Sequence, residues 1–275
     1  MNLATKRLRL PLGVGAGLIY LFLYAPIVVV VVHSFNAAAR GGPWTGFTLS
    51  WYARLFESPD KLAALRNTVV LAAASTGIST FVGSLLGLGL VRYAFPGRKL
   101  FAWLVYLPIV IPDVVMAVAM LMFYQVCREA FGLFQLGLST MIVAHVTFQI
   151  PFVAVVVRSR LAGLDAALEE AAHDLGADAW QTFRHVTLPL MAPGVFAGAA
   201  LAATLSIDDF VISFFTSGPG ATTLPILVYS SVKRGITPDV NALSTLIVLV
   251  SVLGTLATTL LQRRNQASSR PPGYP

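Results

Sequence analysis

Charged side chains are scarce in this chain. Only 11% of its 275 residues are Asp, Glu, Lys or Arg, whereas 56% are hydrophobic. Soluble globular domains carry about 25% charged residues, so this sequence has too few to coat a water-exposed surface. The composition excludes a typical cytosolic enzyme and a disordered chain, and it favours a single bundle of membrane spans.

Cysteine and the common catalytic motifs are also nearly absent. Cys127 is the only cysteine, so no intrachain disulfide can form. No Gly-Lys pair occurs, which excludes a P-loop for nucleotide phosphates, and neither H-E-x-x-H nor G-x-S-x-G is present. Residues 230–233 fit S-x-x-K without its companion motifs, and we interpret this match as chance. The sequence therefore predicts no enzyme activity, cofactor or metal site in this chain.

Long uncharged stretches dominate what is present. A stretch of about 20 apolar residues can cross the hydrocarbon core as a helix. The sequence predicts six such spans, at about 10–33, 67–91, 100–126, 137–157, 186–209 and 240–262. The uncharged segment 210–232 is interrupted by Ser217-Gly218-Pro219-Gly220, so we expect it to form a re-entrant or surface loop. The predicted fold class is an all-α membrane protein, with one transmembrane domain over 1–265 and a flexible tail over 266–275.

The basic residues predict the orientation of these spans. The N-terminal run resembles the start of a signal peptide, but its apolar stretch is too long, so we expect a retained first helix. Six spans place both termini on one side. Assigning that side to the cytoplasm collects most of the 19 basic residues there, as the positive-inside rule requires. We therefore expect cytoplasmic N- and C-termini.

The hydrophilic segment 158–185, between the fourth and fifth predicted spans, is the most informative part of the chain. Asp165 is placed to cap a helix over 166–175, and Gly176 can end it in a left-handed conformation. Asp178 and Gln181 have the spacing of a capping box, and Pro189 is expected to end this second helix before the fifth span. A compact helix–turn–helix is shaped to dock into a partner, although a solvated connector is the alternative.

The same segment resembles the EAA loop of ABC-importer permeases. Glu170-Ala171-Ala172, then Gly176, then Val186-Thr187-Leu188-Pro189 match the pattern in residue identity, spacing and location, with Val186 in place of Ile as the only departure. The resemblance implies that Glu170, Ala171, Ala172, Gly176, Leu188 and Pro189 couple this chain to a separate ATPase subunit. ATP and its Mg would then be bound by that partner.

A narrower resemblance points to spermidine/putrescine permeases, and among them to the second, C-type or I-type, subunit. The residues that carry it are Leu23–Pro26, Ile111–Asp113, Thr204–Phe210, Ser217–Gly220, Leu224-Pro225, Tyr229-Ser230, Val232-Lys233, Thr237-Pro238 and Asn241–Leu243. The resemblance implies a bacterial inner membrane importer with a second permease subunit as heterodimer partner, two ATPase subunits and a periplasmic substrate-binding protein. No nucleic acid partner is implied.

Three carboxylates in or at the ends of the predicted spans are candidates for a cation path. Asp113 is placed near the middle of the third span, where a charge usually faces a cavity or a partner. Asp208 and Asp209 close the fifth span beside Phe210. Carboxylates among aromatic rings suit an extended cation, and we include Tyr229 in this path. A helix-kink role for Asp113 and a capping role for Asp208 or Asp209 remain the alternatives.

Two further features predict packing inside the chain. His145 and Gln149 lie one helical turn apart and are expected to hydrogen-bond between helices rather than to contact substrate. Gly13/Gly17 and Gly83/Gly87 have the spacing that lets helices approach closely, and we expect packing inside the chain, with an oligomer interface as the alternative.

Other functions stay open at this point. The same kind of permease could carry iron, phosphonate or an amino acid derivative, but an anionic cargo would favour intramembrane Lys or Arg, which the predicted spans lack. A secondary transporter or channel would often show inverted repeats, which we do not find, and a membrane-embedded enzyme would need a nucleophile–base set.

Overall fold

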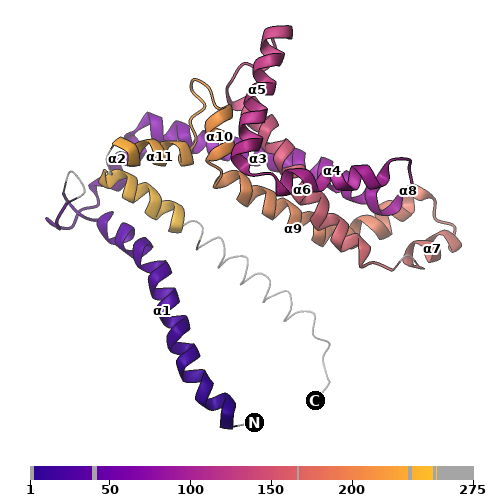
Figure 1. Ribbon diagram of the computed structural model, residues 1–275, viewed down its shortest axis with the longest axis horizontal. Coiled ribbons are helices and arrows are strands. Elements are labelled where there is room, and N and C mark those ends of the chain that lie inside the picture. Colours follow the sequence, from indigo (N-terminus) through magenta and orange to yellow (C-terminus); the bar gives the residue numbers. More distant parts are fainter. Residues whose placement is uncertain (1–2, 39–41, 166, 235–236, 250–251, 253–275) are drawn as a thin grey trace. The chain divides into compact units, whose positions relative to one another are not determined.

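The computed structural model describes residues 3–38, 42–165, 167–234, 237–249 and 252 (Figure 1). In that part of the chain the regular elements are helices, apart from one isolated β-bridge between Asn36 and Phe47. The all-α fold class is therefore confirmed. The chain divides into two compact units, one formed by residues 1–62 and 228–275 and the other by residues 63–227.

Within the described residues, five helices are long and apolar enough to cross a membrane. They are Gly13–His33 within α1 (Leu3–His33), α3 (Pro59–Arg92), α5 (Asp113–Phe131), α6 (Leu138–Ala162) and Ala179–Ile207, which ends with α9 (Leu188–Ile207). Four of these correspond to the predicted first, second, fourth and fifth spans. The predicted sixth span, 240–262, begins within the apolar helix Pro238–Leu249. Apart from residue 252, its remainder and the predicted tail 266–275 lie outside the described residues.

The predicted third span is not one continuous helix. Residues 100–126 are divided between α4 (Arg98–Val110) and α5, and the two helices run in clearly different directions (Figure 1). The break lies at Ile111, which has an extended backbone with ψ 133°, followed by Pro112. Proline disfavours a helical conformation in the residue before it and donates no backbone hydrogen bond. Hydropathy alone could not show this break because both halves are apolar.

The segment 210–232 also divides, as the sequence predicts. It forms α10 (Val211–Thr216) and most of α11 (Leu224–Arg234), with the Ser-Gly-Pro-Gly stretch between them. Neither helix is long enough to cross a hydrocarbon core, which needs about 20 residues. This segment therefore contributes no span.

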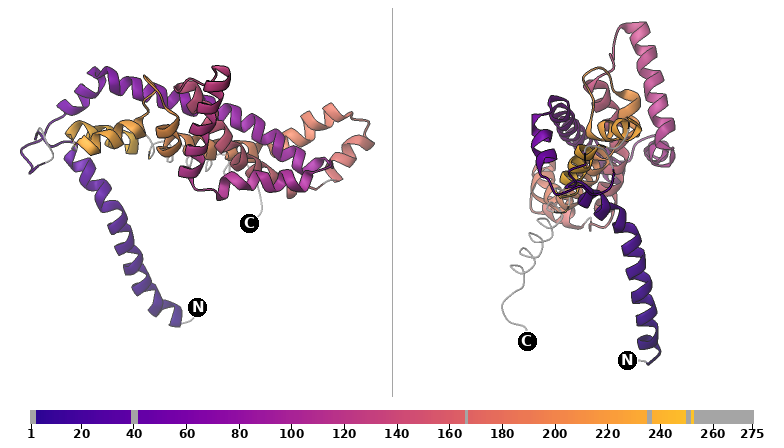
Figure 2. Two further views of the ribbon diagram at one scale, coloured as in Figure 1. Left: turned by 45° about the horizontal axis from the view of Figure 1, so that its top comes forward. Right: turned by 90° about the vertical axis from the view of Figure 1, so that its left-hand side faces the viewer.

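Close helix contacts organise the unit of residues 63–227, in which α6 packs along α9 and also contacts α4 and α10. The views in Figure 2 show these helices from two further directions. At Gly83 and Gly87 of α3, an added Cβ would lie 2.7 Å from the Val153 side chain and 2.8 Å from the Ala154 carbonyl oxygen, respectively. Real side chains do not tolerate such distances, so these two glycines let α3 approach α6, and the predicted intrachain role of this pair is confirmed.

The other unit contains α1, α2 (Ser50–Glu57) and the chain between them. The Ser34 hydroxyl lies 2.7 Å from the Tyr52 hydroxyl, and Trp51 Nε1 donates to the Asn36 carbonyl oxygen at 2.8 Å. Lys61 forms an ion pair with Asp239. Burial would raise the pKa of Asp239, but hydrogen bonds from Lys61 and Thr237, together with the Lys61 charge, lower it below its ordinary value.

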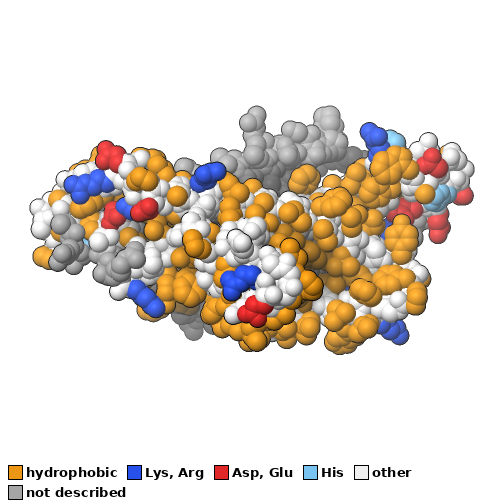
Figure 3. All heavy atoms as spheres, turned by 90° about the horizontal axis from the view of Figure 1, so that it is seen from above, with side chains coloured by type: hydrophobic (Ala, Val, Ile, Leu, Met, Phe, Trp, Pro, Cys, Tyr) orange, Lys and Arg blue, Asp and Glu red, His pale blue; other side chains and the backbone are white. Residues whose placement is uncertain are grey.

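The molecular surface is largely apolar. Figure 3 shows hydrophobic side chains over most of the visible face, with charged side chains confined to a few small groups. Examples of strongly exposed apolar residues are Phe22, Trp103 and Val110, with 80%, 77% and 78% of their surface exposed. Contiguous apolar surface of this kind is typical of lipid-facing helices.

Candidate coupling loop and transport path

The EAA residues lie on the exposed helix α7 (Ala167–Asp174). Glu170 and Ala171 are exposed and Ala172 is half-buried. The helix begins where the Asp165 carboxylate accepts a hydrogen bond from the Ala167 amide at 3.0 Å. Because α7 is only two turns long, this local capping is an important part of its stability.

A left-handed turn ends α7 at Gly176, whose φ is +84°. The turn is closed by hydrogen bonds from the Gly176 amide to the His173 carbonyl oxygen at 2.9 Å and from the Ala177 amide to the Ala172 carbonyl oxygen at 3.0 Å. A residue with a Cβ is strained at such a φ. The predicted position of the stop is confirmed.

The second helix of the loop begins with the capping box expected from the sequence. Asp178 accepts a hydrogen bond from the Gln181 amide at 2.7 Å, and the Gln181 side chain accepts one from the Asp178 amide at 3.0 Å. This cap starts α8 (Ala179–Thr182). Two apolar side chains near the turn point away from the protein: Leu175 is 89% exposed and Trp180 is 65% exposed.

Pro189 does not end this helix, contrary to the sequence-based expectation. The chain continues from α8 through a π-helical turn, η1 (Phe183–Thr187), directly into α9, where Leu188 and Pro189 occupy the first turn and are exposed. A proline ring clashes with the carbonyl group four residues earlier in an ordinary helix. The wider π turn, closed by the Leu188 amide on the Phe183 carbonyl oxygen, changes the backbone geometry there, so the helix continues without a break.

One carboxylate connects the loop to the rest of its unit. Arg92 Nη2, at the end of α3, lies 2.9 Å from Glu169 Oε1 on α7. The same oxygen accepts a hydrogen bond from the buried Thr187 hydroxyl at 2.8 Å. Both ionic side chains are largely shielded, with 21% and 23% of their surface exposed. Glu169 therefore joins α3, α7 and the start of α9, a role that sequence analysis missed because Glu169 lies beside the motif rather than in it.

Asp113, the first candidate of the cation path, is the first residue of α5 and is exposed. It does not lie in the middle of a span, because the proline-induced break places it at a helix start. There, its carboxylate is favoured by the partial positive charge of the helix N-terminus.

Asp208 and Asp209 differ sharply although they are adjacent. Asp208 follows α9 and is exposed. Asp209 has only 10% of its side-chain surface exposed, and its carboxylate accepts hydrogen bonds from the backbone amides of Ile212 at 3.2 Å and Ser213 at 2.7 Å. Asp209 thus caps α10, the alternative role that the sequence had left open.

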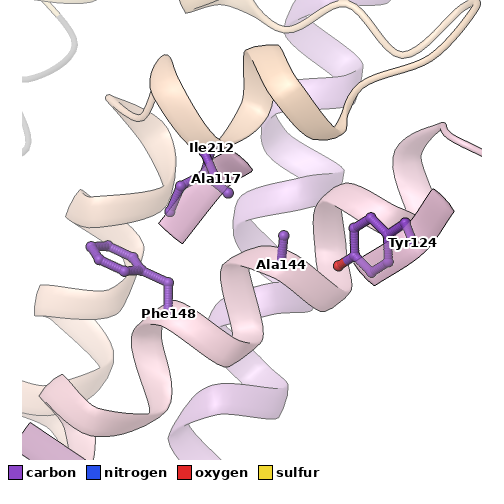
Figure 4. Close-up of a cluster of buried hydrophobic side chains, with 5 residues drawn as sticks. All are labelled: Ala117, Tyr124, Ala144, Phe148 and Ile212. Carbon is purple, nitrogen blue, oxygen red and sulfur yellow. The ribbon is translucent and has the colours of Figure 1, made fainter. Parts of the chain in front are cut away.

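A cluster of buried apolar side chains joins α5, which begins at Asp113, to α10, which follows Asp209. Ala117 lies one helical turn after Asp113, and Ile212 lies three residues after Asp209. Both belong to a cluster with Tyr124, Ala144 and Phe148, in which Ile212 and Ala117 are side by side (Figure 4). Phe210 and Phe214 add an aromatic pair with ring centroids 5.3 Å apart. Tyr229 belongs to the other unit, where Lys233 Nζ lies 4.8 Å from its ring centroid.

A continuous chain of hydrogen bonds joins four helices of this unit, α3, α6, α9 and α10. Ser79 donates to Gln149 Oε1 at 2.9 Å, and Gln149 Nε2 donates to Ser75 Oγ at 3.3 Å. Ser75 Oγ lies 3.1 Å from Ser206 Oγ, which lies 2.9 Å from His145 Nδ1.

This chain of hydrogen bonds ends at the carboxylate of Asp209, which caps α10. His145 Nε2 lies 3.0 Å from Ser213 Oγ and 3.3 Å from Asp209 Oδ2. Polar groups inside a membrane protein are costly unless they are paired, and here each buried group has a partner. The predicted interhelical role of His145 and Gln149 is confirmed. The serines were missed, although Ser75/Ser79 repeat the one-turn spacing of His145/Gln149 on a second helix.

In the described part of the chain, no group of three or more His, Cys, Asp or Glu side chains could hold a metal ion. The side chains of the loop and the path can pair with cations, cap helices and form packed contacts.

Comparison with known proteins shows the family to which this chain belongs. Residues 79–270 match the family of binding-protein-dependent transport system inner membrane components. The chain is 40% identical over 245 residues to the spermidine/putrescine transport system permease protein PotC of Escherichia coli (strain K12), covering 89% of this chain and 91% of that protein. It is also 40% identical over 254 residues to the putrescine transport system permease protein PotI of the same organism, covering 91% and 90%.

Solved structures agree on the fold. A bacterial ABC transporter involved in the import of the acidic polysaccharide alginate matches with a TM-score of 0.75 and 20% identity, over 94% of this chain and 96% of that chain. The same transporter type in complex with an alginate-bound periplasmic protein matches with a TM-score of 0.71, over 90% and 93%. The chain therefore belongs to the family of inner membrane components of binding-protein-dependent transport systems, and it is the permease subunit of an ABC importer.

Proposed function

We propose that this permease subunit takes up polyamines, such as putrescine and spermidine, across the bacterial inner membrane. The observation that carries the proposal is that Asp113, at the start of α5, and Asp208, directly after α9, are exposed carboxylates in the same unit as the Phe210/Phe214 aromatic pair. Relatives with 40% identity over most of the chain are named for the transport of these two polyamines. A polyamine offers several ammonium groups separated by methylenes, which suit carboxylates and aromatic rings respectively.

The proposed path comprises Asp113, Asp208, Asp209 and Phe210 in the unit of residues 63–227, and Tyr229 of the other unit stays a prediction from the sequence. Asp113 and Asp208 would form ion pairs with the passing ammonium groups, and the aromatic rings would contact the methylenes. Asp209 would act mainly by holding α10, and with it Phe210 and Phe214, in place. No Lys or Arg occurs in 67–91, 100–126, 137–157 or 186–209. These segments therefore contain no positively charged side chain of Lys or Arg that would repel a cation.

Coupling to ATP hydrolysis is proposed to use the loop between α6 and α9. Glu170 would pair with a cation of the ATPase subunit. Ala171 and Ala172 have small side chains and would let that subunit approach α7 closely. Leu175 and Trp180, which are strongly exposed, would be covered by that partner. ATP and Mg would be bound by the partner, and the Glu169 contacts with Arg92 and Thr187 would transmit movement of the loop to α3 and α9.

The proposed assembly contains this chain, a second permease subunit, two ATPase subunits and a periplasmic substrate-binding protein. Both termini of the chain would be cytoplasmic, following the distribution of basic residues. Reporter fusions test the orientation: a reporter after Arg264 should be cytoplasmic and one near Gly220 periplasmic. If both report the same compartment, the proposed topology is wrong.

Uptake by the assembled importer tests the substrate. Membrane vesicles containing all subunits should accumulate labelled putrescine or spermidine when ATP is supplied, and excess unlabelled polyamine should compete. An amino acid derivative, a phosphonate and an iron chelate serve as alternative cargoes. Accumulation of one of these, without polyamine uptake, would overturn the polyamine proposal while leaving the importer class unchanged.

A further inference from the structure

A basic cavity lies between α4 and α6, and its lining shares no residue with the proposed transport path or the EAA motif. Its volume is about 290 Å³, and it is lined by Lys99, Ala102, Trp103 and Tyr106 of α4 and by Arg158 of α6. Two cations and two amphipathic aromatic side chains thus converge on one opening. None of these residues has a role in the proposed function.

The two cations of this cavity differ from the neighbouring arginines, which have partners within the chain. Arg92 pairs with Glu169, Arg98 donates to the Leu90 carbonyl oxygen at 2.9 Å, and Arg160 donates to the Leu190 carbonyl oxygen at 3.1 Å. Among the residues that the structure describes, neither Lys99 nor Arg158 has a hydrogen bond or an ion pair. Their positive charges are therefore available to a ligand.

The position of the cavity along α6 corresponds to the boundary of the hydrocarbon core. From Leu138 to Val157 the helix has about 20 residues without a charge, which span roughly 30 Å at the helical rise of 1.5 Å per residue. Arg158 is the first charged residue after this stretch. Lys99 similarly precedes the apolar part of α4. Both cations therefore lie where lipid headgroups meet the acyl chains.

The aromatic side chains fit the same depth. Trp103 is 77% exposed and Tyr106 is 39% exposed, and both lie on the apolar part of α4. Trp and Tyr are enriched at membrane–water interfaces, because their rings are apolar and their N–H or O–H groups stay hydrated. A soluble partner would leave these rings at the membrane boundary without a matching surface.

We propose that Lys99 and Arg158, with Trp103 and Tyr106, bind the headgroup phosphate of an anionic phospholipid such as cardiolipin or phosphatidylglycerol. The planar guanidinium of Arg158 can hold two phosphate oxygens at once, and Lys99 adds a second positive charge. Trp103 and Tyr106 cover the glycerol and the upper acyl chain. Basic pockets between membrane helices bind lipids of this class. The inference requires a membrane-embedded chain, but it depends neither on the cargo nor on the path residues.

The test measures lipid binding by the purified, complete importer. Binding of cardiolipin and of phosphatidylglycerol is compared with that of phosphatidylcholine by native mass spectrometry, for the wild type and for the double variant Lys99→Gln/Arg158→Gln. Each cation near a membrane surface contributes about 1 kcal/mol of attraction, and about 1.4 kcal/mol corresponds to a tenfold change in affinity. The double variant, which lacks both cations, should therefore bind the anionic lipids roughly 30-fold more weakly. Phosphatidylcholine binding should not change.

Two matched variants keep the result interpretable. Arg66→Gln/Arg128→Gln removes the same charge from exposed positions on α3 and α5 and should bind the anionic lipids as the wild type does. Lys99→Arg/Arg158→Lys preserves both charges and should retain most of the binding. The melting temperature in phosphatidylcholine shows that each variant remains folded.

Three results would overturn the proposal. The first is wild-type binding of cardiolipin and phosphatidylglycerol by Lys99→Gln/Arg158→Gln. The second is competition by millimolar inorganic phosphate, which would assign the cavity to a free anion. The third is loss of the ATPase subunit from the double variant in every lipid, which would assign the cavity to a protein interface. Uptake of polyamine is not used as a readout, so a wrong cargo would leave the test valid.

Discussion

The two regions with proposed functions differ in how their polar side chains are paired. In the loop between α6 and α9, the motif residues Glu170 and Ala171 are exposed, and Glu170 has no partner in the described part of the chain. At the far end of α9, His145 and Asp209 are nearly buried and fully hydrogen-bonded. The side chains proposed to meet another molecule are exposed, whereas the side chains that position a helix are hydrogen-bonded within the chain.

This comparison divides the three acids of the proposed path. Asp113 and Asp208 belong with the open group because both are exposed. Asp209 belongs with the satisfied group because its oxygens already contact two backbone amides and His145. Charge alone would give the three residues equal importance for cation transport. Their surroundings separate a contacting role from a positioning role.

The largest effect is expected from reversing a charge in the open group. Glu170→Lys would place a cation against the proposed cation of the ATPase subunit, replacing a charge-assisted hydrogen bond by repulsion. Uptake per inserted molecule should fall at least about tenfold, together with co-purification of the ATPase. Glu129→Lys, at another exposed position, is the control and should transport normally. Normal uptake by Glu170→Lys would remove Glu170 from the proposed coupling contact.

The next effect separates the neighbouring aspartates. Asp209→Asn removes the charge from a buried pair, so we expect a loss of about 1–3 kcal/mol in unfolding free energy. Asp208→Asn should leave the stability unchanged within about 0.5 kcal/mol, because its side chain is exposed, but should raise the KM for polyamine. Thermal unfolding of the purified complex and uptake normalised to folded protein measure the two quantities. Equal melting temperatures for both variants would contradict the division of roles.

A charge exchange tests the connection between the loop and α3. Glu169→Arg should uncouple ATP hydrolysis from uptake, because it opposes Arg92 and removes the acceptor of Thr187. Combining it with Arg92→Glu restores an ion pair across the same two positions. We expect this double variant to recover part of the ratio of polyamine transported to ATP hydrolysed, with a coupling energy of about 0.5–3 kcal/mol. Additive losses in the double variant would show that the pair does not transmit movement.

The smallest effect is expected in the other unit, at the ion pair between Lys61 and Asp239. Partly exposed pairs contribute about 0–1 kcal/mol, so Asp239→Asn should lower the melting temperature only slightly at pH 7. The folded-state pKa of Asp239 is below its ordinary value, so this stabilisation is present above the unfolded-state pKa and is lost as pH falls through the folded-state pKa. The difference from the wild type should therefore disappear in acid. Glu57→Gln, at an exposed position, should show no such pH dependence.

The sequence predicted those parts of the molecule whose structure is determined by residues close together in the chain. The apolar runs gave four of the spans, and Asp178 with Gln181 gave the capping box, because hydropathy and capping depend on neighbouring residues. The EAA residues were recognisable because identity and spacing coincide in one short segment.

The remaining features depend on tertiary contacts or on competing local effects. The third span was predicted as one helix because Ile111 and Pro112 do not interrupt its hydropathy, only its backbone. Pro189 was expected to end a helix because a π turn has no recognised sequence signal. Ser206 and Ser213 are distant in sequence from His145, so their shared network could be seen only in the fold.

Parallel measurement of uptake and ATP hydrolysis in the reconstituted importer tests most directly whether recognition and coupling reside in separate regions. Asp113→Asn should raise the KM for putrescine while ATP hydrolysis per complex stays near the wild-type level. Glu170→Lys should lower both uptake and ATP hydrolysis and leave the KM of the residual uptake unchanged. If the two variants show the same pattern in both measurements, the division between an exposed coupling contact and a cation path is wrong.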